Sequence, residues 1–184
     1  KNVGVNPSRT GLLTILRTMG AQIDIRYNRD YSLEPIADIE VKKSTLHGIE
    51  VPQELVPQAI DEFPALFVAA ACADGTTVVS GAKELRYKES DRLRVMAEGL
   101  KILGTEVSEQ PDGLTISGGS LDGGTVDSCN DHRAAMAFAM ASVAAKGPIE
   151  ILGASKVATS FPNFLITAAQ AGLKVESSAR TTVD

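Results

Sequence analysis

Residues 88–92, Lys-Glu-Ser-Asp-Arg, place two cations and two acids within about one helical turn. The apolar positions that follow are three or four residues apart: Leu93, Met96, Leu100 and Leu103. This spacing predicts a helix with one buried face, capped by a serine or aspartate of the motif and ended by Gly104. Lys88 and Arg92 would then flank the helix N-terminus, where backbone N–H groups and cations favour a phosphate or carboxylate. Unless the residues are merely solvated surface, we expect an anion site that contains an acid, Glu89.

Two further clusters have the same form. Asn130-Asp131-His132-Arg133 precedes an apolar run at 134–145, and Ile60-Asp61-Glu62-Phe63-Pro64 precedes another at 65–73. Acidic residues and a proline at such positions are typical of a helix start. Three helices are therefore expected to begin with ionisable groups and to continue into the core.

Composition limits the class of protein. With 184 residues and 43% hydrophobic content, the chain can bury the core of one domain or of two tight sub-units. Its apolar runs are shorter than the ~20 residues of a membrane span, and no signal peptide is visible, so we expect no membrane partner. A net charge of −5 and the absence of Trp argue against nucleic acid.

The cysteines and histidines are few. Cys72 and Cys129 look unpaired, which fits a reducing cytoplasm. His47 and His132 offer no metal-ligand spacing, so no metal is expected. Because the chain starts at Lys1 rather than Met, and its first six residues read as a strand, we expect it to be cut from a longer protein.

An internal repeat predicts the architecture. Residues 60–82 resemble 130–154, and each segment precedes a helix, a glycine and a strand, at 96–107 and 165–175. The opening residues 12–23 form a third copy of that last element, and a hairpin is expected over 105–117, turning at Pro111-Asp112-Gly113. The repeating unit reads βαβαββ. Because the Ala-rich helices are apolar nearly all round and the strands alternate, we expect an α/β fold with parallel helices buried inside and mixed sheets outside. The three charged clusters would then meet at one end.

Four segments carry a family resemblance. ELRYKESDRL, IDEFPALFVAAA, NDHRAAMAF and SFPNF resemble the C-terminal half of the 5-enolpyruvylshikimate-3-phosphate (EPSP) synthase family, of the bacterial glyphosate-tolerant type. The resemblance implies the inverse α/β barrel of enolpyruvyl transferases, with residues 1–184 as the C-terminal domain and the N-terminal domain absent. It implies a cytoplasmic enzyme that moves the enolpyruvyl group of phosphoenolpyruvate to the 5-hydroxyl of shikimate 3-phosphate. No metal or organic cofactor is implied.

The resemblance also implies roles in the chemistry. Asp61 would contact the shikimate hydroxyls and accept the 5-hydroxyl proton, unless it is only a helix cap. Lys88 would touch the shikimate ligand and Asp61. Glu89 would protonate the methylene carbon of phosphoenolpyruvate, and His132 would orient Glu89 or lie near the ligand, unless its role is structural.

Two arginines would hold phosphoenolpyruvate. Arg92 and Arg133 would clamp its carboxylate, where ordinary surface ion pairs are the alternative. The chain also departs from its relatives at two positions. Thr159 stands where many carry a lysine aimed at the phosphate, and Glu84 stands where others carry Asn.

Two other functions remain open. The sister enolpyruvyl transferase that acts on UDP-N-acetylglucosamine shares the fold and the reaction, but Lys-Glu-Ser-Asp-Arg is not its signature. A non-catalytic binding or assembly module built from the same repeats is the second. Because the family's other phosphate-binding residues lie in the N-terminal domain, the chain alone is expected to be inactive.

Overall fold

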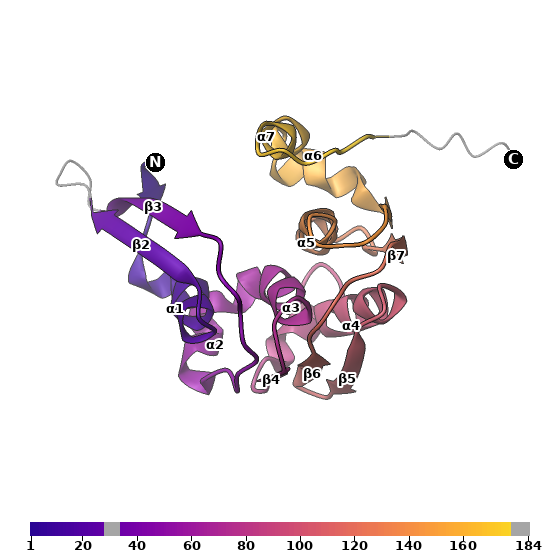
Figure 1. The fold of residues 1–184 in the computed structure, drawn as a ribbon, viewed down its shortest axis with the longest axis horizontal. Helices are drawn as coiled ribbons and strands as arrows, with labels where there is room; N and C mark the ends of the chain where they lie inside the picture. The colour runs from indigo at the N-terminus through magenta and orange to yellow at the C-terminus, as the bar shows by residue number, and fades with distance from the viewer. Residues whose placement is uncertain (28–33, 178–184) are drawn as a thin grey trace, which may run out of the picture.

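The computed structural model describes residues 1–27 and 34–177, and Figure 1 shows sheets on three sides of a group of helices. The strands are β1 Val3–Gly4, β2 Gln22–Tyr27, β3 Ile36–Lys42, β4 Thr76–Val79, β5 Glu106–Gln110, β6 Gly113–Ser117, β7 Gly124–Asp127 and β8 Ile149–Leu152. The helices are α1 Gly11–Thr18, α2 Val56–Ala59, α3 Phe63–Ala71, α4 Arg92–Ile102, α5 His132–Ala141, α6 Val157–Ser160 and α7 Phe164–Gln170. Short 3-10 turns join them: η1 Pro7–Arg9, η2 Gln53–Leu55, η3 Ile60–Glu62, η4 Lys83–Tyr87 and η5 Ala154–Lys156.

Two of the sheets are antiparallel, in the orders β1-β3-β2 and β4-β6-β5, and the third pairs β7 with β8 in parallel. The chain before α2 also runs parallel to β4, since Gly48 N donates to Asp74 O at 2.8 Å and Val51 N donates to Val78 O at 2.9 Å. This extended segment, α3 and β4 therefore correspond to β7, α5 and β8. The predicted internal repeat is confirmed for these strand–helix–strand units.

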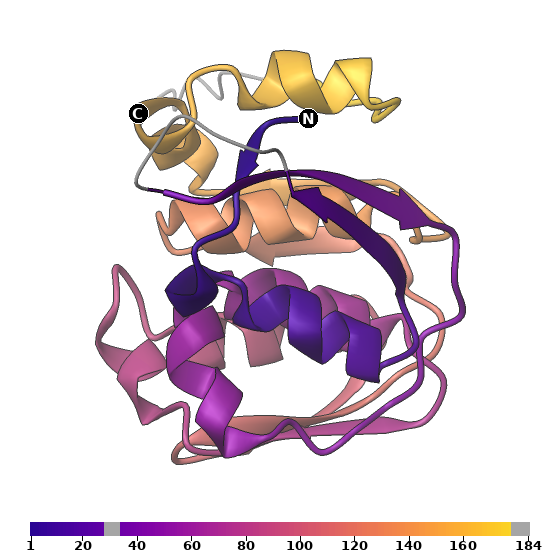
Figure 2. The same ribbon diagram turned by 90° about the vertical axis from the view of Figure 1, so that its left-hand side faces the viewer.

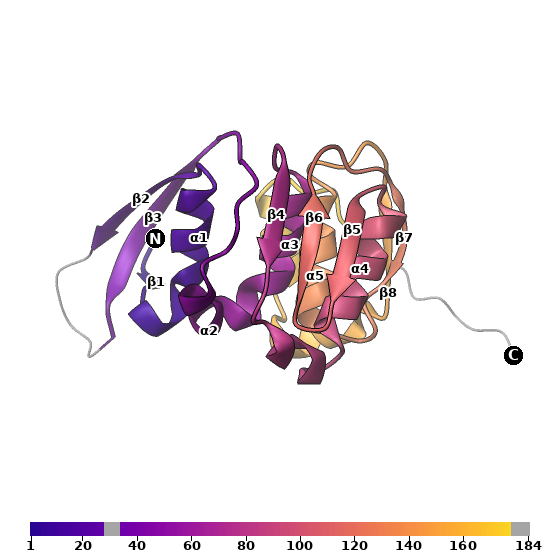
Figure 3. The ribbon, with the colours of Figure 1, turned by 90° about the horizontal axis from the view of Figure 1, so that it is seen from below.

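The Ala-rich helices lie inside, as predicted. Phe63, Leu66, Phe67 and Ala70 of α3 are fully buried, and α3 packs against both α4 and α5. Seen from below, β4, β6 and β5 lie in front of these helices (Figure 3). In Figure 2, α1 faces the viewer, and the yellow-orange α6 and α7 lie over α5. Helices inside and sheets outside is the expected α/β architecture.

Local signals placed α4 and the hairpin correctly. Leu93, Met96, Leu100 and Leu103 are all fully buried. Asp91 caps α4 by accepting from Arg94 N at 3.1 Å, and Gly104, at φ +85°, follows the helix end in the left-handed region that glycine tolerates. In the hairpin, Gln110 pairs with Gly113 across the predicted turn.

Three local predictions were wrong in extent. The apolar run at 134–145 does not stay helical, because the chain turns after Ala141 and Lys146 N bonds Leu121 O at 2.9 Å on the way to β8. The strand expected at the end of 165–175 is absent from the described residues, where no neighbouring strand pairs with it. The first strand is confined to Val3–Gly4, where β3 pairs with it.

Within residues 1–27 and 34–177, no helix is long and apolar enough to cross a bilayer. The same described residues contain no group of three or more His, Cys, Asp or Glu side chains that could hold a metal ion.

Candidate active site

The N-termini of α3, α4 and α5 meet, as the three charged clusters predicted. Arg92, the first residue of α4, reaches Asp61 just before α3 and Asp131 at the start of α5. Asp131 caps α5, because its Oδ1 accepts from Arg133 N at 2.9 Å and from Ala134 N at 3.3 Å. Three helix N-termini therefore contribute positive potential to one place.

Asp61 lies among four cations. Its Oδ1 is 3.6 Å from Arg92 Nη1 and 3.7 Å from Lys88 Nζ, and its Oδ2 is 3.6 Å from both Arg9 Nη2 and Arg133 Nη2. None of these four contacts is within hydrogen-bond distance. The four cations thus surround the carboxylate without occupying its oxygens, which remain able to accept hydrogen bonds from a ligand.

Arg92 is the most buried cation of the site, with a side chain 1% exposed. Its Nε donates to Asp131 Oδ2 at 2.8 Å, and its Nη2 forms an ion pair with Glu89. Its Nη1 has no hydrogen-bond partner among the residues that the structure describes. Because an unpaired buried guanidinium N–H is costly, Nη1 is suited to donate to an incoming anion.

Asp131 is fully buried and supports both arginines. Besides Arg92, its Oδ2 accepts from Ser90 Oγ at 3.1 Å. Burial by itself raises the pKa of Asp131, but the hydrogen bond and charge of Arg92 and the backbone N–H groups of Arg133 and Ala134 bring this pKa below its ordinary value. Sequence reasoning treated Asp131 only as part of a motif, although an acid before an apolar helix marks a cap.

Lys88 bridges two acids. Its Nζ forms an ion pair with Glu84 and lies near Asp61. The hydrogen bond with Glu84 raises the pKa of Lys88, and the charges of Glu84 and Asp61 act in the same direction against partial desolvation. Lys88 therefore remains a cation at neutral pH. Glu84 serves here as its partner.

Glu89 and His132 lie at the edge of this cluster. The Glu89 side chain is 49% exposed and its one ion pair among the described residues is with Arg92. His132 is the first residue of α5, and the structure as described gives it no hydrogen bond with Glu89. The orienting role expected of His132 thus stays a prediction.

Arg9 and Glu62 also join the cluster, although the sequence analysis assigned neither of them a role in the site. Arg9 Nη2 donates to Glu62 Oε1 at 2.7 Å, and Arg133 Nη1 donates to the backbone oxygen of Asp61 at 3.1 Å. Glu62 Oε2 is buried and has no hydrogen-bond partner within residues 1–27 and 34–177. Arg9 is 52 positions from Asp61 along the chain, so no local signal links them.

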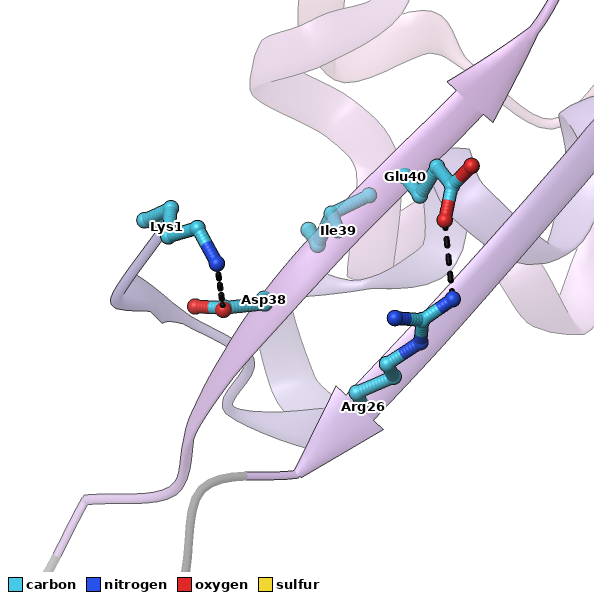
Figure 4. Close-up of a pocket in the computed structure, with 5 residues that line it drawn as sticks. All are labelled: Lys1, Arg26, Asp38, Ile39 and Glu40. Carbon is cyan, nitrogen blue, oxygen red and sulfur yellow. Dashed lines mark hydrogen bonds and ion pairs between the residues drawn. The ribbon is translucent and has the colours of Figure 1, made fainter.

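The remaining positions lie elsewhere. Thr159 and Lys156 are exposed on and beside α6, and neither bonds to the cluster in the described part of the chain. A shallow depression on the β2–β3 sheet is lined by Lys1, Arg26, Asp38, Ile39 and Glu40 (Figure 4). Its exposed ion pairs, Lys1 with Asp38 and Arg26 with Glu40, do not reach the helix N-termini.

The geometry suits an anionic ligand beside a carboxylate able to move a proton, and comparison with known proteins shows the family. The family described as EPSP synthase (3-phosphoshikimate 1-carboxyvinyltransferase) matches residues 1–167. The chain belongs to the EPSP synthase family. This match favours the EPSP synthase interpretation over the sister enzyme.

Its relatives within the EPSP synthase family are close. A 3-phosphoshikimate 1-carboxyvinyltransferase of Nitrosococcus oceani is 59% identical over 95% of this chain and 39% of the relative's length. One of Acidithiobacillus ferrooxidans is 58% identical over 96% of the chain and 41% of the relative. A solved EPSP synthase from Acinetobacter baumannii has a TM-score of 0.93 and 52% identity, covering 96% of this chain and 42% of that one. The chain thus spans about two fifths of these relatives.

Proposed function

We propose that residues 1–184 are the C-terminal domain of an EPSP synthase, whose N-terminal domain is not part of this sequence. The complete protein would transfer the enolpyruvyl group of phosphoenolpyruvate to the 5-hydroxyl of shikimate 3-phosphate and release phosphate. The observation that carries the proposal is the meeting of three helix N-termini around Asp61, beside a buried Arg92 whose Nη1 lacks a hydrogen-bond partner in the described part of the chain.

The arginines would bind phosphoenolpyruvate. Arg92 is buried and has Nη1 free to donate, and Arg133 is half-buried on the other side of Asp61. A planar guanidinium pair of this kind matches a carboxylate. Lys88 would bind shikimate 3-phosphate, because its Nζ lies 3.7 Å from Asp61, the acid that would contact the shikimate hydroxyls.

The two acids would divide the proton transfers. Glu89 gives a proton to the methylene carbon of phosphoenolpyruvate, which makes the neighbouring carbon electrophilic. The 5-hydroxyl oxygen attacks that carbon while Asp61 takes the hydroxyl proton. The tetrahedral adduct then loses phosphate as Glu89 helps to remove a proton from the new methyl group. His132 would lie near the ligand or orient Glu89.

Three finer assignments complete the proposal. Free Cys72 and Cys129 support a reducing, cytoplasmic location. The chemistry above needs no metal or organic cofactor. The four sequence segments support membership of the bacterial glyphosate-tolerant type.

The test uses the full-length protein with Glu89→Gln and Asp61→Asn. Glu89→Gln should keep both substrates bound while slowing turnover about a hundredfold, because the proton donor is removed. It should also slow hydrogen exchange into the methylene of phosphoenolpyruvate, which reports the Glu89 step alone. Asp61→Asn should slow turnover and also weaken binding of shikimate 3-phosphate.

The matched control is Glu98→Gln on α4, an exposed acid paired only with Arg94 in the described structure. It should leave turnover within about twofold. Methylene exchange at the parental rate in Glu89→Gln would assign the acid to another residue. If the parental full-length protein releases no phosphate from the two substrates, a non-catalytic module becomes the better interpretation.

A further inference from the structure

Arg86, on η4, makes four hydrogen bonds near the site without touching Asp61. Its Nε donates to Pro111 O at 2.7 Å and its Nη2 to Gln110 O at 2.5 Å. Its Nη1 donates to Asp91 Oδ2 at 2.8 Å and to Glu109 Oε1 at 2.9 Å. All three nitrogens of the guanidinium are therefore engaged, and its side chain is only 20% exposed.

These contacts close a loop around Lys88, Glu89 and Ser90. Arg86 lies just before these residues, and Asp91 lies just after them. Asp91 uses Oδ2 for Arg86 and Oδ1 to cap α4 through Arg94 N. The loop between η4 and α4 has no helix or strand, so side-chain contacts set its shape. Ser90 Oγ donates to Asp131, and the Arg86–Asp91 hydrogen bond joins the two ends of the loop.

The same side chain fastens this loop to a sheet. Glu109, Gln110 and Pro111 belong to the β5–β6 hairpin, and β6 pairs with β4 over residues 114–117. Two of the four acceptors are backbone oxygens, which cannot move without moving the hairpin. The position of the loop is therefore set relative to the sheet rather than only to α4.

We propose that Arg86 is a positioning residue that holds Lys88 and Glu89 in place for the reaction. This inference rests on the proposed function, because it assigns Arg86 to the residues that would bind shikimate 3-phosphate and protonate phosphoenolpyruvate. Arg86 has no contact with Asp61, Arg92 or Arg133 among the described residues, so it acts through the loop.

A lysine cannot replace this arginine. A guanidinium presents a rigid fork of donors, whereas an ammonium is a single charge at the end of a flexible stem. Arg86→Lys keeps the charge and can reach one or two of the four acceptors. Arg86→Gln removes the charge as well. Comparing the two separates geometry from electrostatics.

The substrates should respond unequally. Arg92 is anchored by the fully buried Asp131 outside the loop as well as by Glu89, so the KM for phosphoenolpyruvate should stay within about threefold in both variants. Lys88 belongs to the loop, so the KM for shikimate 3-phosphate should rise about tenfold and kcat should fall about tenfold or more. A merely destabilised enzyme would lose active molecules, which lowers kcat and leaves both KM values unchanged.

The experiment uses full-length protein carrying Arg86→Lys, Arg86→Gln or the control Arg94→Gln. Arg94 is an exposed arginine of α4 whose side chain pairs only with Glu98 among the described residues. Steady-state kinetics are measured below the melting temperature of each variant. Amide hydrogen exchange over residues 87–91 is measured without substrate, and it should be faster in both Arg86 variants than in the control.

The exchange measurement separates this inference from the proposed function. Faster exchange with a raised KM for shikimate 3-phosphate supports the positioning role. Parental exchange at 87–91, or a fall in kcat with both KM values unchanged, overturns it. If the parental protein has no activity, the proposed function fails, and the exchange result alone then supports or overturns the claim that Arg86 holds the loop.

Discussion

Arg92 shows how a buried charge is made tolerable at the level of single residues. Its guanidinium contacts three carboxylates, those of Asp131, Glu89 and Asp61, at distances set by three different helix starts. Taking a charge out of water is costly unless ion pairs and hydrogen bonds replace the water. Asp131 has the largest share of this task, because it alone is fully buried with Arg92. Asp61 and Glu89 are left more accessible to a ligand.

We expect Asp131→Asn to lower the free energy of unfolding at neutral pH by roughly 3 kcal/mol, because it leaves Arg92 buried without its main counter-charge. The pKa of Asp131 is lowered by folding, so its stabilisation is present above its unfolded pKa of about 3.9 and is lost as pH falls through the folded value. The difference between parent and variant should therefore shrink as the pH is lowered below about 4.

Denaturant unfolding of the full-length protein at a series of pH values measures this. The control is Asp122→Asn, which removes an exposed pair with Lys146 and should have little effect at any pH. A parent–variant difference that is independent of pH would show that Asp131 does not stabilise the fold through its charge.

At the level of elements, the site depends on how closely α4 and α5 approach. Gly99 of α4 faces the ring of Phe138 on α5, and a Cβ at Gly99 would lie 2.2 Å from Phe138 Cζ. Phe138 is fully buried, so its ring has little room to move. The glycine therefore sets the spacing of two helices whose N-termini present Arg92 and His132.

Gly99→Ala should destabilise the protein by about 1 kcal/mol or more. Alanine favours a helix over glycine by ~1 kcal/mol, but the overlap with Phe138 costs more, typically 1–3 kcal/mol. Thermal unfolding of the full-length variant measures the net effect. In a Phe138→Leu background the same change should cost less, and equal costs in both backgrounds would place the clash elsewhere. Gly119→Ala, which has open space around it, is the control and should be near neutral.

At the level of the whole molecule, the charged groups around Asp61 come from one end of the group of helices. Three helix N-termini supply cations and acids from one direction, while Lys88 and Glu89 stay partly exposed. A proposed reaction that proceeds through charged intermediates needs water to be excluded and both substrates to be oriented. The chain also spans about two fifths of its relatives, so other parts of those proteins are available for this role.

We therefore expect residues 1–184 alone to release no phosphate from phosphoenolpyruvate and shikimate 3-phosphate. A phosphate-release assay on protein prepared from a host that lacks its own enzyme measures this, with the full-length protein assayed in parallel. Turnover by residues 1–184 near the full-length rate would mean that this chain holds the complete site.

The sequence by itself determined the local elements and which residues gather. Apolar spacing located α4, the Pro-Asp-Gly turn located the hairpin, and polar residues ahead of three apolar runs located three helix starts. These features depend on contacts between residues a few positions apart, which composition and periodicity encode. Because apolar helices must be buried together, their convergence followed as well.

Only the tertiary structure decided how the charges pair. The burial of Arg92 against Asp131, the approach of Arg9 to Glu62 and the three bonds from Arg86 to the β5–β6 hairpin each join segments far apart in the sequence. It also decided that α5 ends at Ala141, where the chain must turn toward β8 despite an apolar sequence. The packing of distant segments determines these partners. The local sequence shows that a charged side chain needs a counter-charge when it is buried, but not which residue lies close enough to supply it.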